Sequence, residues 1–222
     1  MNIFTESVYG QLQSYMLSRK NFYQILHILF SEPDKEEIFF QLSTYGNFGM
    51  LGEFHEGGKI LDQFFKTLTL EQLMFEREEY QRLFIGPGPL VAPPWESYYR
   101  SKEHLVFEEW TFQVREKYRT FGLQYVKENN EPDDHLLLEL EFMIYLSSLC
   151  QSEINLNQIT DIIQCQIDFL EQHLLFWVPD FCKRIIGNTT STLYLGVSML
   201  LEDFISDDLT SLKEIKEVLA DV

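Results

Sequence analysis

Apolar side chains recur three and four residues apart along most of this chain, and that spacing limits its fold more than any other feature does. Two such stripes are Phe22-Ile25-Leu26-Leu29 and Ile60-Phe64-Phe65-Leu68. Each stripe places apolar side chains on one face of a helix. We find no convincing strand alternation, hairpin pattern or internal repeat. The sequence therefore predicts an all-α protein of about nine or ten helices.

The expected helix ends follow from capping and helix-breaking residues. Thr69 and Gln72 form an N-capping pair, and the helix that they open is expected to reach about Ile85. A Gly-rich loop is expected over 46–58, and acidic residues over 131–134 are expected to start a helix that is apolar almost all round. The other expected helices cover Ile38–Leu42, His104–Gly122, Ile159–Trp177, Phe181–Ile186, Leu193–Phe204 and Leu209–Leu219.

One segment interrupts the helical pattern. Four of the seven prolines lie within 86–95, where they remove amide donors and disfavour helical angles. The stripes on either side still look mutually dependent. We therefore expect one domain over 1–222, with a Pro-rich loop over 86–99 between an N-terminal and a C-terminal group of helices.

Charge and composition exclude several classes of protein. The formal net charge is −18, which argues against nucleic-acid binding because phosphate contacts require a basic face. The start of the chain lacks the basic and apolar blocks of a secretory leader, and no apolar run is long enough for a membrane span. The three cysteines lack metal-ligand or disulfide-framework spacing. These features predict a cytoplasmic protein without stable membrane insertion.

Residues 131–135, Glu-Pro-Asp-Asp-His, are the densest polar cluster beside apolar sequence. Capping of the next helix by Asp133 or Asp134, with a His135–Glu139 pair, is the structural interpretation. A metal site would need more ligands than this cluster supplies, and general acid–base catalysis would need a substrate cavity. The glycines near 86 lack a phosphate-binding motif. We therefore expect no catalytic residue, metal or cofactor.

Large aromatic side chains follow the Pro93-Pro94 pair, at Trp95, Tyr98 and Tyr99. Aromatic residues beside a rigid loop usually cover a core. They also form peptide-binding grooves, because they give contact area at a low entropic cost. Composition leaves both interpretations open.

Four motifs in a fixed order resemble the TorD/DmsD family of redox-enzyme maturation chaperones. They are Glu79-Tyr80-x-x-Leu83-Phe84-x-Gly86-Pro87, Pro93-Pro94-Trp95-Glu96-Ser97-x-Tyr99, Glu131-Pro132-Asp133-Asp134-His135-x-x-x-Glu139-Leu140-x-Phe142-Met143, and Phe169-Leu170-x-x-His173-Leu174-x-x-Trp177-x-Pro179-x-Phe181. The resemblance covers about 22–207. Tyr98 departs from the family, which more often has an aliphatic residue there.

The resemblance implies an all-helical cytoplasmic chaperone rather than an enzyme. Such proteins bind the twin-arginine leader peptide, the apo form, or both, of a molybdopterin oxidoreductase precursor. They hold that precursor from export until its cofactor is inserted. The chaperone itself is expected to be a monomer or a dimer.

A leader with a basic start and an apolar core needs an acidic rim beside an apolar groove. We expect the rim to comprise Glu79, Glu96, Asp133 and Asp134. We expect the groove to comprise Leu83, Phe84, Trp95, Tyr98 and Tyr99. The full expected binding site adds Pro94, Ser97 and His135, with Glu79 and Glu139 in support.

Three rival hypotheses remain at this point. The first is an all-helical enzyme or nucleotide-binding protein that uses Asp134, His135 and Glu139. The second is a DNA-binding regulator, which the acidic balance disfavours. The third is an assembly chaperone that acts on the body of the enzyme rather than on its leader.

Overall fold

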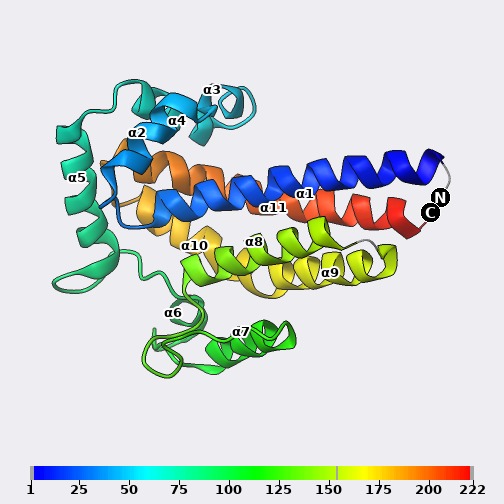
Figure 1. Cartoon of the computed structure of the whole chain (residues 1–222). Coiled ribbons are helices and arrows are strands. Elements are labelled where there is room, and N and C mark those ends of the chain that lie inside the picture. The colour runs from blue at the N-terminus through cyan, green and yellow to red at the C-terminus, as the bar shows by residue number, and fades with distance from the viewer. Residues whose placement is uncertain (1–2, 154, 221–222) are drawn as a thin grey trace.

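Four long helices lie side by side and form the body of the molecule (Figure 1). They are α1 (Ile3–Phe30), α8 (Leu136–Ser152), α9 (Leu156–Phe169) and α11 (Thr192–Ala220). The computed structural model describes residues 3–153 and 155–220. Helix α8 packs along α1, while α9 contacts both α8 and α11. Helices α1 and α11 are antiparallel, so the start of one lies beside the end of the other (Figure 1).

Shorter helices cover one end and one side of this body. The remaining segments are α2 (Glu36–Tyr45), α3 (Phe48–Leu51), α4 (Glu56–Lys66), α5 (Leu70–Tyr80), η1 (Gln81–Ile85), α6 (Glu96–Arg100), α7 (Glu109–Thr120), η2 (Leu170–Leu174) and α10 (Leu175–Ile186). The η segments are π-helical turns that continue α5 and join α9 to α10. The described residues therefore form ten continuous helices and no strand, which confirms the predicted fold class. That one domain spans all of 1–222 stays a prediction.

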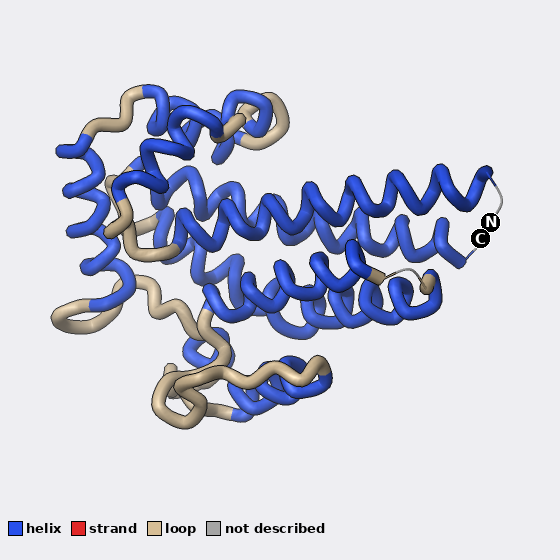
Figure 2. The backbone as a smooth tube through the Cα atoms, in the orientation of Figure 1, coloured by secondary structure: helices blue, strands red, loops and turns tan. Residues whose placement is uncertain are grey.

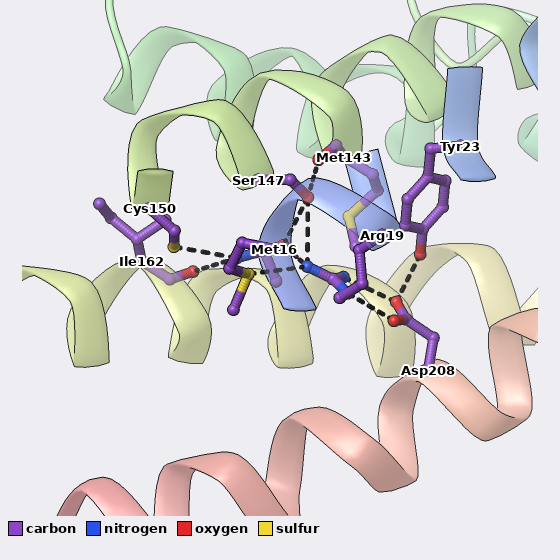
Figure 3. Close-up of polar contacts among 9 residues, drawn as sticks. Met16, Arg19, Tyr23, Met143, Ser147, Cys150, Ile162 and Asp208 are labelled. Atoms are coloured by element: carbon purple, nitrogen blue, oxygen red, sulfur yellow. Dashed lines mark hydrogen bonds and ion pairs between the residues drawn. The ribbon is translucent and has the colours of Figure 1, made fainter. Parts of the chain in front are cut away.

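A fully buried arginine joins the four long helices (Figure 3). The Arg19 guanidinium donates to both carboxylate oxygens of Asp208, at 2.5 and 2.7 Å. It also donates to Ser147 Oγ at 3.1 Å and to Gln166 Oε1 at 2.5 Å. The Tyr23 hydroxyl donates to Asp208 at 2.7 Å. Since these partners come from α1, α8, α9 and α11, the ion pair holds all four helices in register.

This ion pair explains why one prediction was wrong. The sequence analysis predicted two helices, Leu193–Phe204 and Leu209–Leu219, which leaves the run 205–208 between them outside a helix. The structure has one continuous helix, α11, through that run. Asp208 faces inward, where Arg19 neutralises it, so the polar run presents its other side chains to solvent.

A second predicted break, between Trp177 and Phe181, is also absent. Helix α10 continues through Pro179 to Ile186. Proline has no amide to donate to the carbonyl of Leu175, four residues earlier. The π-helical turn η2 ends just before that residue, so the ladder is already irregular where the bond is missing.

The predicted helix ends are partly confirmed. Thr69 and Gln72 form the predicted capping box at the start of α5. Two expectations were wrong: the segment 46–58 contains α3 and the start of α4, and α7 begins at Glu109 rather than near His104. His104 and Phe107 have φ values of 56° and 61°, in the left-handed region that ends regular helix.

The Pro-rich loop runs from η1 to α6, along the end of the helical body where α8 begins (Figure 2). It contains no regular helix between Gly86 and Trp95, as predicted. Within the part of the chain that the structure describes, no helix has both the length and the apolar character that crossing a membrane requires. The fold thus brings the Pro-rich loop against the start of α8, and the candidate site lies there.

Candidate functional site

Two segments that are 40 residues apart in sequence pair through their backbones at the start of α8. Trp95 and His135 form an isolated antiparallel bridge. The Glu96 amide donates to the Asp134 carbonyl at 3.0 Å, and the Leu136 amide donates to the Pro94 carbonyl at 2.9 Å. The bridge therefore fixes the Pro-rich loop against the first turn of α8.

A small apolar cavity, the Trp95 notch, opens beside this bridge. Its volume is about 50 Å³, and it is lined by Phe30, Tyr80, Phe84, Ile85, Pro94, Trp95, His135, Leu136, Leu137 and Phe181. The Trp95 and His135 rings meet edge to face with centroids 5.6 Å apart. Both side chains are half-buried, so each presents one face to solvent. The notch has room for a single side chain of a ligand.

His135 is the N-cap of α8. Its Nδ1 accepts a hydrogen bond from the Leu137 amide at 3.1 Å, and the helix begins at Leu136. The prediction that Asp133 or Asp134 would be the cap was therefore wrong. Burial lowers the pKa of His135 to about 4. The ring is thus neutral at physiological pH, with its proton on Nε2 and its Nδ1 free to accept.

The expected acidic rim is not at the surface. Glu96, Asp133 and Asp134 are completely buried, and Glu79 is 6% exposed. Burial of a carboxylate requires a partner, and each of these has one. Arg115 donates to Asp133 at 2.8 Å and 3.2 Å, and Arg82 donates to both oxygens of Glu79 at 2.7 Å. Hydrogen bonds from Arg82 lower the pKa of Glu79, which stays ionised.

Asp134 joins the loop to α6 and α7. Its carboxylate accepts from the Ser97 amide at 2.6 Å, in the first turn of α6. It also accepts from the Thr111 hydroxyl of α7 at 2.8 Å. Burial raises the pKa of Asp134, although both hydrogen bonds favour its charged form. Asp134 therefore holds the backbone on which Trp95 stands, and it does not face a ligand.

Glu96 lies deeper and contacts the π-helical turn η2. Arg100, one helical turn later, donates to Glu96 Oε1 and to the Gln172 carbonyl. His173 Nδ1 lies 2.8 Å from Glu96 Oε2. The wide turn of η2 places His173 inside the protein, where it is 1% exposed. Glu96 thus links α6 to η2.

Glu139 is the third buried carboxylate of this group. Trp177 Nε1 donates to its Oε2 at 3.0 Å, while its Oε1 has no hydrogen-bond partner. Burial raises the pKa of Glu139 well above its usual range, and the nearby charge of Glu96 adds to that rise. Burial thus favours the protonated form of Glu139. The expected His135–Glu139 pair does not form, because Trp177 takes the carboxyl group.

We call Glu96, Arg100, Asp134, Glu139 and His173 the buried acid network. Glu96 is the carboxylate of this network that accepts a hydrogen bond from Arg100. Glu96 directly follows Trp95, and Asp134 directly precedes His135, so the network lies directly beneath the bridge. It supports the Trp95 notch from the inside of the protein.

The expected groove residues divide into two groups. Phe84, Pro94, Trp95 and His135 line the notch. Leu83 is wholly buried in the core, and Ser97 is buried beneath the loop, so these two do not line it. Tyr99 packs on Trp177 with centroids 5.4 Å apart, and Tyr98 stacks on His104 at 4.7 Å. The structure therefore brings together only part of the expected site.

The sequence analysis missed several residues of the site. Phe30, Tyr80, Ile85, Leu136, Leu137 and Phe181 also line the notch. Among them, Ile85 is 57% exposed, which periodicity alone does not reveal. Arg100 could have been found, because it stands four residues after Glu96 on the same helical face. His173 and Trp177 belong to a quoted motif, but no local pattern links them to Glu96 and Glu139.

The residues of the rival enzyme hypothesis do not converge on a cavity. Asp134 and Glu139 are wholly buried and bonded to structural partners, while His135 alone reaches the notch. Over the described ranges 3–153 and 155–220, no group of three or more histidine, cysteine, aspartate or glutamate side chains is arranged to hold a metal ion. The geometry favours binding at the notch over acid–base chemistry.

The family described as nitrate reductase delta subunit matches residues 53–183, which is more than half of the chain. The chain therefore belongs to this family, which is the TorD/DmsD family of redox-enzyme maturation chaperones. The resemblance inferred from the four motifs is confirmed.

Several curated proteins are similar to it. The chaperone protein TorD of Vibrio cholerae is 32% identical over 133 residues, 60% of each chain. The Tat proofreading chaperone DmsD of Salmonella typhimurium is 41% identical over 136 residues, 61% of this chain and 60% of the relative. The matches thus span about three fifths of the length of these relatives. TorD of Aliivibrio salmonicida is 24% identical over 210 residues, 90% of this chain and 96% of the relative.

A solved structure supports the fold. A protein of Archaeoglobus fulgidus, described as a redox enzyme maturation protein, superposes with a TM-score of 0.51 at 24% identity. The superposition covers 85% of this chain and 93% of the other. It shows a shared helical architecture.

Proposed function

We propose that this chain is a cytoplasmic chaperone for a molybdopterin oxidoreductase precursor. It binds the twin-arginine leader of that precursor, holds it until the cofactor is inserted, and carries out no turnover of its own. Membership of the TorD/DmsD family supports this proposal. The observation that carries it is the Trp95 notch, a half-exposed apolar cavity built from the family motifs.

The notch suits an apolar side chain better than a charged one. Its walls are aromatic and aliphatic, and the neutral His135 adds no charge. Because the carboxylates nearest to it are buried and paired, we expect the apolar part of the leader to supply most of the affinity. Exposed acids elsewhere add a screened attraction for the arginines, so binding should weaken only moderately in high salt.

Substitution of Trp95 by alanine tests the proposal. We expect a loss of about 2 kcal/mol or more in binding free energy for a leader peptide, as for other aromatic anchors. The loss of stability should stay below the roughly 3–5 kcal/mol that a core tryptophan costs, because Trp95 is only partly buried. Calorimetric titration and urea unfolding measure the two quantities on one variant. Normal affinity in a destabilised protein would show that Trp95 is only a core residue.

The same titration separates the leader from the enzyme body as the client. A leader peptide alone should bind the wild-type chain, and an oxidoreductase that lacks its leader should bind more weakly. The reverse order would favour the assembly chaperone that acts on the enzyme body.

A further inference from the structure

The Trp95 notch, at about 50 Å³, is too small for the apolar segment of a leader peptide. A larger apolar hollow lies further along α8, with a volume of about 460 Å³. That volume falls within the range of ordinary ligand sites. The hollow lies between α8 and the loop that follows α7, and its apolar lining consists of Leu123, Tyr125, Val126, Leu138, Phe142 and Tyr145.

One stripe of α8 connects the notch to the hollow. His135 lines the notch, whereas Leu138, Phe142 and Tyr145 line the hollow. The spacings of four and three residues place Leu138, Phe142 and Tyr145 on one face of α8, and the N-cap His135 stands at the start of that helix. We call this stripe the α8 track. It runs over eleven residues, whose ten steps amount to about 15 Å, which matches about three turns of a helical peptide.

The exposure of the loop side of the hollow is unusual for apolar residues. Val126 is 93% exposed, although it faces the lining of the hollow. An apolar segment that covers this valine would remove its apolar surface from water, which is energetically favourable.

The charges beside the hollow are acidic. Glu141 is the one charged residue that lines it among the described residues, and its side chain is 57% exposed. At the other edge, Glu131 accepts a hydrogen bond from the Tyr125 hydroxyl at 2.7 Å, and its side chain is 50% exposed. Glu141 contacts His27, and Glu131 pairs with Lys127; both partners are solvent-accessible, so a ligand's arginines can replace them. An apolar floor with carboxylates at its edges complements a peptide that is basic at one end and apolar over the rest.

We infer that the apolar segment of the leader lies along the α8 track, with one side chain in the Trp95 notch and the remainder in the hollow. This inference rests on the proposed function and assigns the hollow as the larger part of the same binding surface. Glu131 and Glu141 then stand within reach of the arginine pair.

The test pairs two chaperone variants with two synthetic peptides. The long peptide carries two arginines followed by about twelve leucine and alanine residues, and the short peptide retains only about four of these, enough for the notch but not for the track. The variants are Leu138→Ser and Val126→Ser. Val218→Ser is the matched control, because Val218 is also an exposed valine, 54% exposed, but lies on α11 away from the track.

We expect Leu138→Ser to weaken the long peptide about fivefold to tenfold, as the loss of one buried leucine contact would. The short peptide should bind wild type and variant equally. Val126→Ser should act in the same direction, and since its side chain is almost wholly exposed this variant should fold normally. Val218→Ser should bind both peptides like the wild type. Peptide titrations followed by fluorescence anisotropy measure all of these affinities.

Unchanged binding of the long peptide to both track variants overturns the inference, as does an equal loss for both peptides. A change from dimer to monomer in the track variants, with peptide binding intact, assigns the hollow to self-association and overturns it too. If the wild-type chain binds neither peptide, the proposed leader-binding function itself is wrong.

Discussion

The molecule contains two buried polar clusters, and they are built differently. In the cluster around Arg19, one cation meets one carboxylate, and all three guanidinium nitrogens have partners. In the buried acid network, three carboxyl groups lie near one arginine, Arg100, which donates to Glu96 alone, and Glu139 Oε1 and Arg100 Nε have no hydrogen-bond partner. Buried polar groups are normally satisfied, and exceptions concentrate at functional sites. The first cluster fastens the long helices, whereas the second supports the loop that carries Trp95, where we propose that the leader binds.

The location of each cluster agrees with this division. Arg19 and Asp208 lie among the four long helices, where no cavity of the site opens. Glu96 and Asp134 flank the bridge that carries Trp95 and His135. Damage to the first cluster should therefore affect stability alone, and damage to the second should affect stability and leader binding together.

The largest expected effect is that of Asp208→Ala. It leaves Arg19 buried without a counter-ion, which should lower the free energy of unfolding by about 3–5 kcal/mol. Urea unfolding measures this loss. The neighbouring Asp207→Ala changes an exposed residue and should stay within about 0.5 kcal/mol of wild type. Where the Asp208 variant is folded, it should bind a leader peptide normally, and weakened binding would contradict the division.

Asp134→Ala should cost somewhat less stability and should also weaken leader binding. It removes the acceptor of the buried Ser97 amide and Thr111 hydroxyl, and unsatisfied groups cost about 1–3 kcal/mol each. Loss of an exposed helix cap would cost only about 1 kcal/mol. Because Asp134 holds the loop that carries Trp95, we expect weaker leader binding in a calorimetric titration. A variant that loses stability but keeps its affinity would place Asp134 with the structural cluster.

Glu139→Gln should have a smaller effect, whose sign depends on pH. The raised pKa of Glu139 means that the folded protein binds a proton that the unfolded chain releases near its usual pKa of about 4.3. The stability of the wild type therefore falls as pH rises above that value towards the folded pKa. Glutamine removes this contribution, so the variant should become more stable relative to the wild type as pH rises from about 4.3 towards the folded pKa of Glu139, which urea unfolding at a series of pH values measures. Parallel unfolding free energies across this range would show that Glu139 is not protonated.

Local patterns predicted the fold well because helical periodicity is a local property. The capping box at Thr69 and Gln72 and the break at the Pro-rich loop both depend on neighbouring residues, and both are present. The helix through the run before Leu209 was missed because the acidic residue of that run is neutralised by Arg19, which is 189 residues away. A distant partner of this kind leaves no trace in a local pattern.

The candidate site was predicted less well for the same reason. Trp95 and His135 were both expected in the site, and the structure places them beside each other. The acidic rim was wrong because four carboxylates that look exposed have partners in the fold. The Glu79–Arg82 and Glu96–Arg100 pairs were visible as helical spacings of three and four residues. The His173–Glu96 contact joins residues that are 77 positions apart and requires the wide turn of η2. Residue spacing in the sequence does not predict such a contact.

The smallest expected effect is that of His135→Asn, which retains a capping side chain at the start of α8. Asparagine caps helices well, so stability at neutral pH should change by only about 0.5 kcal/mol. Because the pKa of His135 is lowered in the folded protein, the unfolded chain binds a proton between about pH 6.5 and 4 that the folded protein does not bind. The wild type should therefore lose stability relative to the variant as pH falls from about 6.5 towards 4, the opposite trend to that of Glu139. Urea unfolding of both proteins over this range measures the difference.

Leader affinity should also fall by a small factor, because the edge-to-face contact with Trp95 is lost. A variant that keeps both the pH response and the affinity of the wild type would show that His135 does not contribute to binding at the notch.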